Sequence, residues 1–263
     1  MRKSMRPISL KRIIEVCSYI HSEKNVLVKD FSLYFDITTR RTREILNEIN
    51  SMGLIIVEDQ SISSNNNTNN FIDLIKSQNW IAINDYFFNN HIFYHRIMEF
   101  LSSKLIEEGF SIEELVSNLN ASEYHFNNSS VEILLRWGER LGSLQRNLYK
   151  NTYYGISSKE TKLKEFEKHV RLVYRKLNTK KGLFLSRTYI EIPQLREELC
   201  EDLKITRTKF NKQFIDYYRN NLDKVELTGA PTITSTKKSP LNEKRTEFNL
   251  DGDVITLNYD LET

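Results

Sequence analysis

Apolar residues recur at helical spacing near the start of the chain. Leu10, Ile13, Cys17 and Ile20 lie three or four positions apart, which predicts an amphipathic helix whose apolar stripe needs a packing partner. A second short helix is predicted at residues 29–35. The chain is therefore expected to open with helices.

The next segment predicts a capped helix followed by a strand. Thr38 suits the N-cap position, and Gly53 suits the left-handed residue that ends a helix. The run LIIV at residues 54–57 predicts a strand, and the Asn-rich residues 61–70 predict the polar tip of a hairpin. The buried stripe of the capped helix is expected at Thr42, Leu46, Ile49 and Met52.

This order of two helices, a capped helix and a hairpin resembles the winged helix-turn-helix superfamily. The resemblance covers residues 9–70, from the first apolar stripe to the Asn-rich segment. It implies a mainly α fold with small β-wings, in which the third helix normally enters the major groove of DNA. DNA binding is the commonest role in the superfamily, whereas many other members only join proteins together.

The pattern around the capped helix recurs twice further along the chain. Counted from an origin residue, it has a capping residue at −4, a bulky apolar residue at +4 and a turn-forming residue at +11. The origins are Thr42, Val131 and Phe210; the matching residues are Thr38, Leu46 and Gly53, then Asn127, Leu135 and Gly142, then Thr206, Phe214 and Asn221. Such a repeat predicts tandem winged-helix modules. We expect module one at 1–70, a helical connector plus module two at 71–156, and module three at 157–263.

The segments between these repeats predict further helices and wings. Residues 71–104 predict two or three short aromatic-rich helices, and residues 143–156 predict the second wing. The third wing is expected in residues 225–228 and the Asp251-Gly252 hairpin. An apolar stripe between Lys159 and Lys181 predicts a charged helix, which is either the first helix of module three or a dimer seam.

Charge alternates along the chain, although the net charge is only +3. Residues 1–53 carry 10 basic and 6 acidic residues, 54–130 carry 3 and 10, 131–190 carry 14 and 5, and 191–263 carry 11 and 14. Two basic blocks that alternate with two acidic ones indicate a localised surface that faces a polyanion; uneven charge without function is the alternative. With only 8 Gly and 4 Pro among 263 residues, a Gly-rich phosphate-loop enzyme or an all-β barrel is not expected.

Candidate DNA contacts lie on or beside the third helix of each module, where guanidinium, amide and ammonium groups can reach phosphates and base edges. In module three they extend into the long loop before the last hairpin. The candidates are Thr39, Arg40, Arg41, Arg43 and Asn47 in module one, Arg136, Arg140, Arg146 and Lys150 in module two, and Arg207, Lys209, Lys212, Lys237 and Lys238 in module three.

Enzymatic chemistry is less well supported. His91, His95 and Glu99 recur every fourth residue and could hold a metal, but a fourth ligand is not evident, so a structural role is expected. Cys17 and His21 lie one turn apart without an orienting third group. We expect no catalytic residues, no metal and no cofactor.

The sequence thus predicts a non-enzymatic double-stranded DNA-binding protein, cytoplasmic and nucleoid-associated, without a membrane segment. One hypothesis is a sequence-reading transcription regulator or replication-initiator-like protein. The alternative is an accessory subunit of a DNA-processing or genome-defence complex, which uses modules two and three for protein contacts. Its partner would be an ATPase, a nuclease or a second copy of the chain, and the acidic residues 107–123 slightly favour a protein partner.

Overall fold

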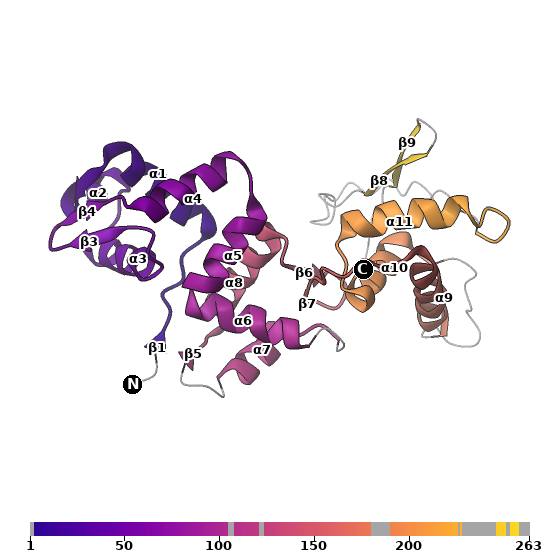
Figure 1. Ribbon diagram of the computed structural model, residues 1–263. Helices are drawn as coiled ribbons and strands as arrows, with labels where there is room; N and C mark the ends of the chain where they lie inside the picture. Colours follow the sequence, from indigo (N-terminus) through magenta and orange to yellow (C-terminus); the bar gives the residue numbers. More distant parts are fainter. Residues whose placement is uncertain are drawn as a thin grey trace, which may run out of the picture. The chain divides into compact units, whose positions relative to one another are not determined.

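The computed structural model shows a mainly helical protein with small sheets (Figure 1). It describes residues 3–104, 108–120, 124–179, 190–225, 227, 246–250 and 253–257. The chain divides into two compact units, at residues 1–157 and 158–263. The first unit contains both segments expected as modules one and two, and the expected boundary after residue 70 falls inside a helix.

The first half of unit one is a three-helix group with a small sheet. The helices are α1 (Leu10–Glu23), α2 (Val28–Tyr34) and α3 (Thr39–Ser51). The strands are β2 (Asn25–Leu27), β3 (Ile56–Glu58) and β4 (Ser61–Ser63), which form an antiparallel sheet in the order β2-β4-β3. The strand between the first two helices therefore pairs with the last strand.

The ends of α3 follow from two residues. The Thr38 hydroxyl accepts a hydrogen bond from the Arg41 backbone N–H, which satisfies a helix donor that has no partner within the helix. Gly53 has φ of +72°, a left-handed conformation that costs glycine little. The predicted stripe is buried as expected, and Ile45 joins it, so the predicted helix is confirmed.

The second half of unit one repeats this order of elements. It contains α6 (Ile92–Ser103), α7 (Ile112–Leu119), α8 (Asn128–Leu141), β6 (Leu144–Asn147) and β7 (Thr152–Gly155). An isolated antiparallel bridge joins Phe110, between α6 and α7, to Tyr153 of β7, which itself pairs with β6. Asn127 forms a capping box with Ser130, and Gly142 has φ of +77°. The hairpin predicted at residues 143–156 is confirmed.

Two further helices and the first residues of the chain join these halves. Helix α4 (Asn66–Lys76) packs on α1, and α5 (Trp80–Asn90) packs on α4, α6 and α8. At the chain start, β1 (Lys3–Ser4) pairs in parallel with β5 (Tyr124–His125). Residues 5–9, which we call the arm, follow β1 with the side chains of Met5 and Ile8 buried.

The Asn-rich segment was expected to be a hairpin tip, and this was wrong. The strands β3 and β4 are joined at residues 59–60, and the asparagines instead begin α4. Asn65 caps that helix together with Thr68, and its side-chain amide donates to the Gly53 carbonyl at 3.0 Å. Asparagine favours caps and turns alike, so composition could not separate the two.

Unit two packs three helices together. They are α9 (Leu163–Thr179), α10 (Ile192–Leu203) and α11 (Arg207–Arg219), and a hairpin of β8 (Thr246–Leu250) and β9 (Asp253–Leu257) follows. The apolar stripe of α9 faces α11 within the unit, where the Phe166 and Phe210 rings lie 5.7 Å apart. This packing favours the reading of α9 as the first helix of a module over a dimer seam.

Two expectations at the end of α11 were wrong. Asn221 does not adopt a left-handed conformation; its side-chain amide donates to the Tyr217 carbonyl, and its own carbonyl accepts from Val225 N–H. These bonds extend the helix end into a further turn. Val225 and Leu227 lie outside any strand, and Glu226 and Thr228 lie outside the described residues. The hairpin strands around Asp251-Gly252 are confirmed, although that pair itself is outside the described part.

Candidate nucleic-acid interface

Helix α3 presents a polar and basic face to solvent. Thr39, Arg40, Arg43 and Asn47 are exposed, and Arg40 keeps 83% of its side chain accessible. They lie opposite the buried stripe because the helix repeats every 3.6 residues. Among the described residues, Arg43 and Asn47 have no side-chain partner. Their donors are available to an external acceptor.

A carboxylate organises the arginines at the start of α3. Glu44 lies 3.1 Å from Arg41, 3.4 Å from Arg40 and 4.0 Å from Arg6 of the arm. The hydrogen bond from Arg41, aided by the neighbouring arginines, lowers the pKa of Glu44. One carboxylate thus faces three guanidinium groups, so the cluster keeps a positive charge.

Arg41 differs from the other candidates on α3. Its guanidinium donates to the Pro7 carbonyl of the arm at 3.0 Å and to Glu44 at 3.1 Å. The side chain is half-buried and fixes the arm to the helix. Arg6, which the sequence analysis did not select, reaches the same cluster from the arm; only its place in the basic start MRKSMR hinted at this role.

The C-terminal half of α3 is held by residues of α5 and of the start of α6. Glu48 lies 3.1 Å from His91 Nε2, and the Tyr86 hydroxyl donates to the Met52 carbonyl at 2.7 Å. His91 Nδ1 accepts from the Tyr94 backbone N–H, so Nε2 carries the ring proton that Glu48 accepts. The end of α3 is therefore fixed, while its basic face stays open.

Helix α8 occupies the corresponding place in the second half but is more enclosed. Trp137 is 1% exposed, and its indole N–H donates to the Ile8 carbonyl of the arm at 3.1 Å. Arg136 is paired with Glu132 at 2.6 Å, and Arg140 is exposed beside Glu139. The charges on the exposed side of α8 therefore alternate in sign, so α8 is less suited than α3 to binding a polyanion.

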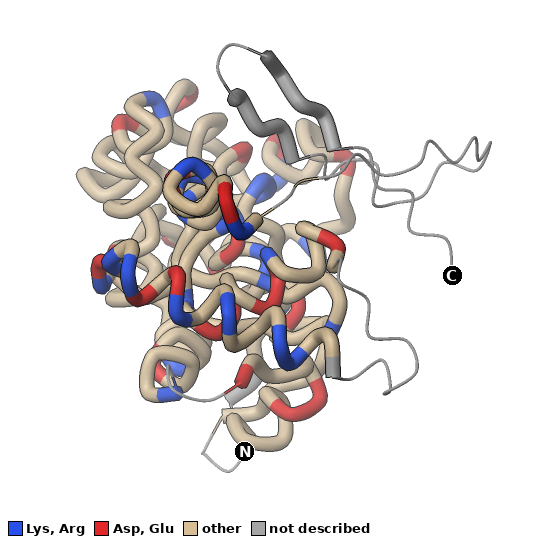
Figure 2. The backbone as a smooth tube through the Cα atoms, turned by 90° about the vertical axis from the view of Figure 1, so that its right-hand side faces the viewer, with Lys and Arg blue, Asp and Glu red and all other residues tan. Residues whose placement is uncertain are grey.

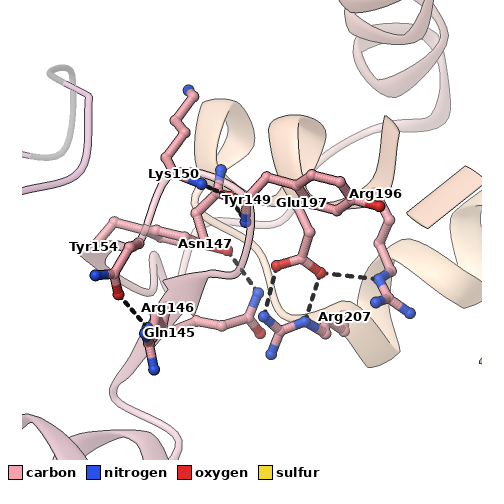
Figure 3. A network of polar contacts seen from close by, with 10 residues as sticks. Gln145, Arg146, Asn147, Tyr149, Lys150, Tyr154, Arg196, Glu197 and Arg207 are labelled. Carbon is pink, nitrogen blue, oxygen red and sulfur yellow. Dashed lines mark hydrogen bonds and ion pairs between the residues drawn. The ribbon is translucent and has the colours of Figure 1, made fainter. Parts of the chain in front are cut away.

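The hairpin after α8 carries two of the candidates, Arg146 and Lys150. The Arg146 guanidinium donates to Asn151 at 2.7 Å and lies 5.7 Å from the Tyr153 ring centre. The Asn147 side chain accepts from the Tyr149 and Lys150 backbone N–H groups, which shapes the turn (Figure 3). These contacts give the hairpin tip a defined geometry.

In unit two, two of the three candidates on α11 are engaged in structural contacts. Arg207 binds both oxygens of fully buried Glu197, at 2.7 and 2.6 Å (Figure 3). Lys209 donates to the Lys159 carbonyl at 3.1 Å, which holds the segment before α9. Lys212 is exposed, and Lys237 and Lys238 lie outside the described residues.

The residues considered for enzyme chemistry have structural surroundings. His91 is the N-cap of α6, while His95 bonds the Phe88 carbonyl. Within the described ranges, His, Cys, Asp and Glu form no group of three or more that could hold a metal ion. Burial raises the pKa of Cys17 to about 12, which disfavours a reactive thiolate. No helix in the described part of the chain is long and apolar enough to cross a membrane.

Comparisons with known proteins returned no relative: no family model and no curated protein matches the chain. What the protein binds must therefore be inferred from its own residues. The structure brings Thr39, Arg40, Arg43 and Asn47 onto one exposed face, where Arg40 also pairs with Glu44. Arg41 and Arg207 are engaged in contacts with other elements, and Arg136 pairs with Glu132 on its own helix.

Proposed function

We propose that this protein binds double-stranded DNA through the exposed face of α3. The observation that carries the proposal is the open row Thr39, Arg40, Arg43 and Asn47. Guanidinium groups pair with phosphates and guanine, and the asparagine amide pairs with adenine. A helix presenting these groups on one side can lie in the major groove.

The repeated order of elements supports a winged-helix reading of unit one. In each half, a strand segment between the first two helices pairs with the last strand of the hairpin. Each half also has a capped third helix and a left-handed glycine after it. Under this proposal α3 is the reading helix, and the protein acts as a sequence-reading regulator or replication initiator.

Acidic residues in the first wing limit how the module can approach DNA. Glu58 and Asp59 are exposed at the tip of the β3–β4 hairpin. Their charges would face phosphates if that tip tracked the backbone, so the proposal relies on α3 and Arg6 rather than on this wing.

The test compares a pair of exposed arginines on α3 with a pair of exposed arginines on α8. Binding of the whole chain to a labelled duplex is measured by fluorescence anisotropy over a range of salt concentrations. Removing two phosphate contacts in Arg40→Ala/Arg43→Ala should make the slope of log K against log salt shallower by about 1.8 and weaken binding at least roughly tenfold. The matched control Arg136→Ala/Arg140→Ala should change affinity much less. Equal effects of the two variants, or no duplex binding by the unaltered chain, would contradict the proposal.

A second candidate function is an accessory subunit that docks onto another protein. It is favoured by an apolar surface at the end of α2, where Leu33 is 71% and Tyr34 64% exposed. The Tyr34 ring stacks on Tyr19 at 4.0 Å, so it is held in place rather than free to fold inward. Exposed aromatic groups of this kind are enriched at protein interfaces. Selection of duplexes from a random pool separates the two: a regulator enriches one site, whereas a subunit does not.

A further inference from the structure

Helix α9 carries a row of basic residues that the sequence analysis did not select. Lys164, Lys168, Arg171 and Arg175 follow one another at spacings of four, three and four residues. At 3.6 residues per turn they fall within about 60° of arc and span about 16 Å of helix. All four are exposed, and they line one open hollow along the helix together with Glu167 and Leu172. We call these four residues the α9 basic stripe (Figure 2, Lys and Arg in blue).

We propose that the α9 basic stripe binds the phosphate backbone of double-stranded DNA. The inference rests on the proposed function, because it assigns a second contact surface to the same ligand. A strand of B-DNA carries one phosphate for about every 3.4 Å along the axis, so a 16 Å row of cations meets several of them. Such contacts strengthen binding without reading sequence.

In the packing of α9, the basic stripe stays accessible to an external ligand, whereas the apolar side of the helix is covered. Phe166, Val170 and Val173 are buried, and Phe166 packs against the rings of Phe210 and Tyr217 in α11. An amphipathic helix that lies on a membrane needs its apolar side for the lipid. The apolar side of α9 is already covered, so an anionic membrane surface fits poorly.

The composition of the stripe also disfavours a protein partner. Lysine is depleted in the centre of protein interfaces, where aromatic residues are enriched. Among the described residues that line the hollow, Leu172 is the only apolar one. Glu167 pairs with Arg171 at 2.6 Å and removes one charge, which still leaves an excess of positive charge.

The other basic residues of unit two are less suited to this role. Arg207 satisfies the buried carboxylate of Glu197, and Lys209 holds the Lys159 carbonyl. Lys164 and Lys168 have no such partner among the described residues. Of the three candidates on α11, Lys212 alone is exposed, so this helix is a weaker candidate for phosphate contact than α9.

The test removes three charges from the stripe and three from elsewhere. The stripe variant is Lys164→Gln/Lys168→Gln/Arg171→Gln, and the control variant Lys11→Gln/Lys24→Gln/Lys76→Gln takes exposed lysines from unit one. Whole chains are titrated against one labelled duplex over a range of salt. The stripe variant should bind with a slope shallower by about 2.7, three contacts at about 0.9 each, while the control variant keeps the slope of the unaltered chain.

The outcomes separate this inference from the proposed function. If the unaltered chain binds DNA, Arg40→Ala/Arg43→Ala weakens it and the stripe variant keeps the full slope, only the stripe assignment is overturned. Failure of the unaltered chain to bind any duplex overturns both. Stripe-dependent binding to vesicles rich in phosphatidylserine, without duplex binding, also overturns both. Circular dichroism checks that each variant is folded. If the triple variant is not folded, the single variant Lys168→Glu, which reverses one exposed charge, replaces it and should weaken duplex binding.

Discussion

Helices α3 and α8 hold equivalent places in the two halves of unit one, yet their surroundings differ. Aligned on Thr42 and Val131, Arg43 corresponds to Glu132, and Glu48 corresponds to Trp137. His91 contacts both members of the second pair: it bonds Glu48 at 3.1 Å, and its ring lies 5.2 Å from that of Trp137. The same position thus holds a partly buried carboxylate in one helix and a fully buried indole ring in the other.

This difference shows that one arrangement of helices serves two purposes. In α8 the outward positions alternate Arg136 with Glu132 and Glu139, while Trp137 fastens the helix to the arm. In α3 the exposed positions are basic or neutral, and none of them is acidic. We infer that α8 supports the position of α3 and that α3 meets the ligand, and the following substitutions probe this division.

The largest effect is expected from Trp137→Ala. The substitution removes a buried ring that contacts Phe87 at 5.0 Å and leaves the Ile8 carbonyl without its donor. Large-to-small changes at such aromatic sites cost about 3–5 kcal/mol. Urea unfolding measures the loss, with Trp80→Ala, at a half-buried site, as the control. A loss no greater than that of the control would show that α8 is not anchored in this way.

Gly138→Ala should have the next largest effect. A Cβ at this position would lie 2.5 Å from Leu144 Cδ2 and 2.7 Å from its Cγ, so the buried Leu144 side chain would have to move. Overpacking of this kind costs about 1–3 kcal/mol in unfolding free energy. Leu144→Ala in the same chain should relieve part of that cost, so the two losses should sum to more than the loss in the double variant. If the losses of the two single variants sum to the loss in the double variant, a clash between the two side chains is contradicted.

Gly142 serves as the matched control for Gly138. It has open space around its Cα, but its φ is +77°. Alanine there should cost about 1–2 kcal/mol through backbone strain alone. Leu144→Ala should leave that cost unchanged.

The smallest effects are expected from two tyrosines that hold the helix ends. The Tyr86 hydroxyl donates to the Met52 carbonyl at the end of α3. The Tyr94 hydroxyl donates to Asn84 Oδ1 at 2.7 Å and accepts from the Ser143 hydroxyl, just after α8, at 2.9 Å. Tyr86→Phe should cost about 1 kcal/mol in unfolding free energy, the typical net value of one hydrogen bond. Tyr94→Phe should cost more than Tyr86→Phe, because it removes two hydrogen bonds.

These tyrosines also predict a dependence on alkaline pH. Burial raises the pKa of both Tyr86 and Tyr94 from 10.0 to about 12. The folded state therefore keeps protons that the unfolded state loses, so stability is full below pH 10 and declines as the pH rises toward 12. The decline, followed by urea unfolding at each pH, should be shallower in Tyr86→Phe/Tyr94→Phe. If stability declines equally in the unaltered protein and in the double variant, groups other than these two tyrosines cause the decline.

The sequence alone determined several helices and most of their predicted ends, because these depend on local chemistry, whereas the start of α4 and the end of α11 were predicted wrongly. The 3.6-residue spacing of apolar side chains predicted α1, α3, α8 and α11, and the capping residues Thr38, Asn127 and Thr206 were all confirmed. Gly53 and Gly142 adopt the left-handed conformation that their positions predicted. Each of these features involves residues within a few positions of one another, which a single sequence displays.

Only the tertiary structure decided which side chains remain for a ligand. Arg41 and Arg43 are indistinguishable by sequence, yet one bonds the Pro7 carbonyl 34 residues away and the other is exposed. Trp137 reaches Ile8 across 129 residues, a contact that no local pattern encodes. A charged or polar side chain bonds whichever partner the folded chain brings within about 3 Å, and that partner is set by long-range packing. The helix faces were therefore predictable, but the division of their residues between structure and ligand was not.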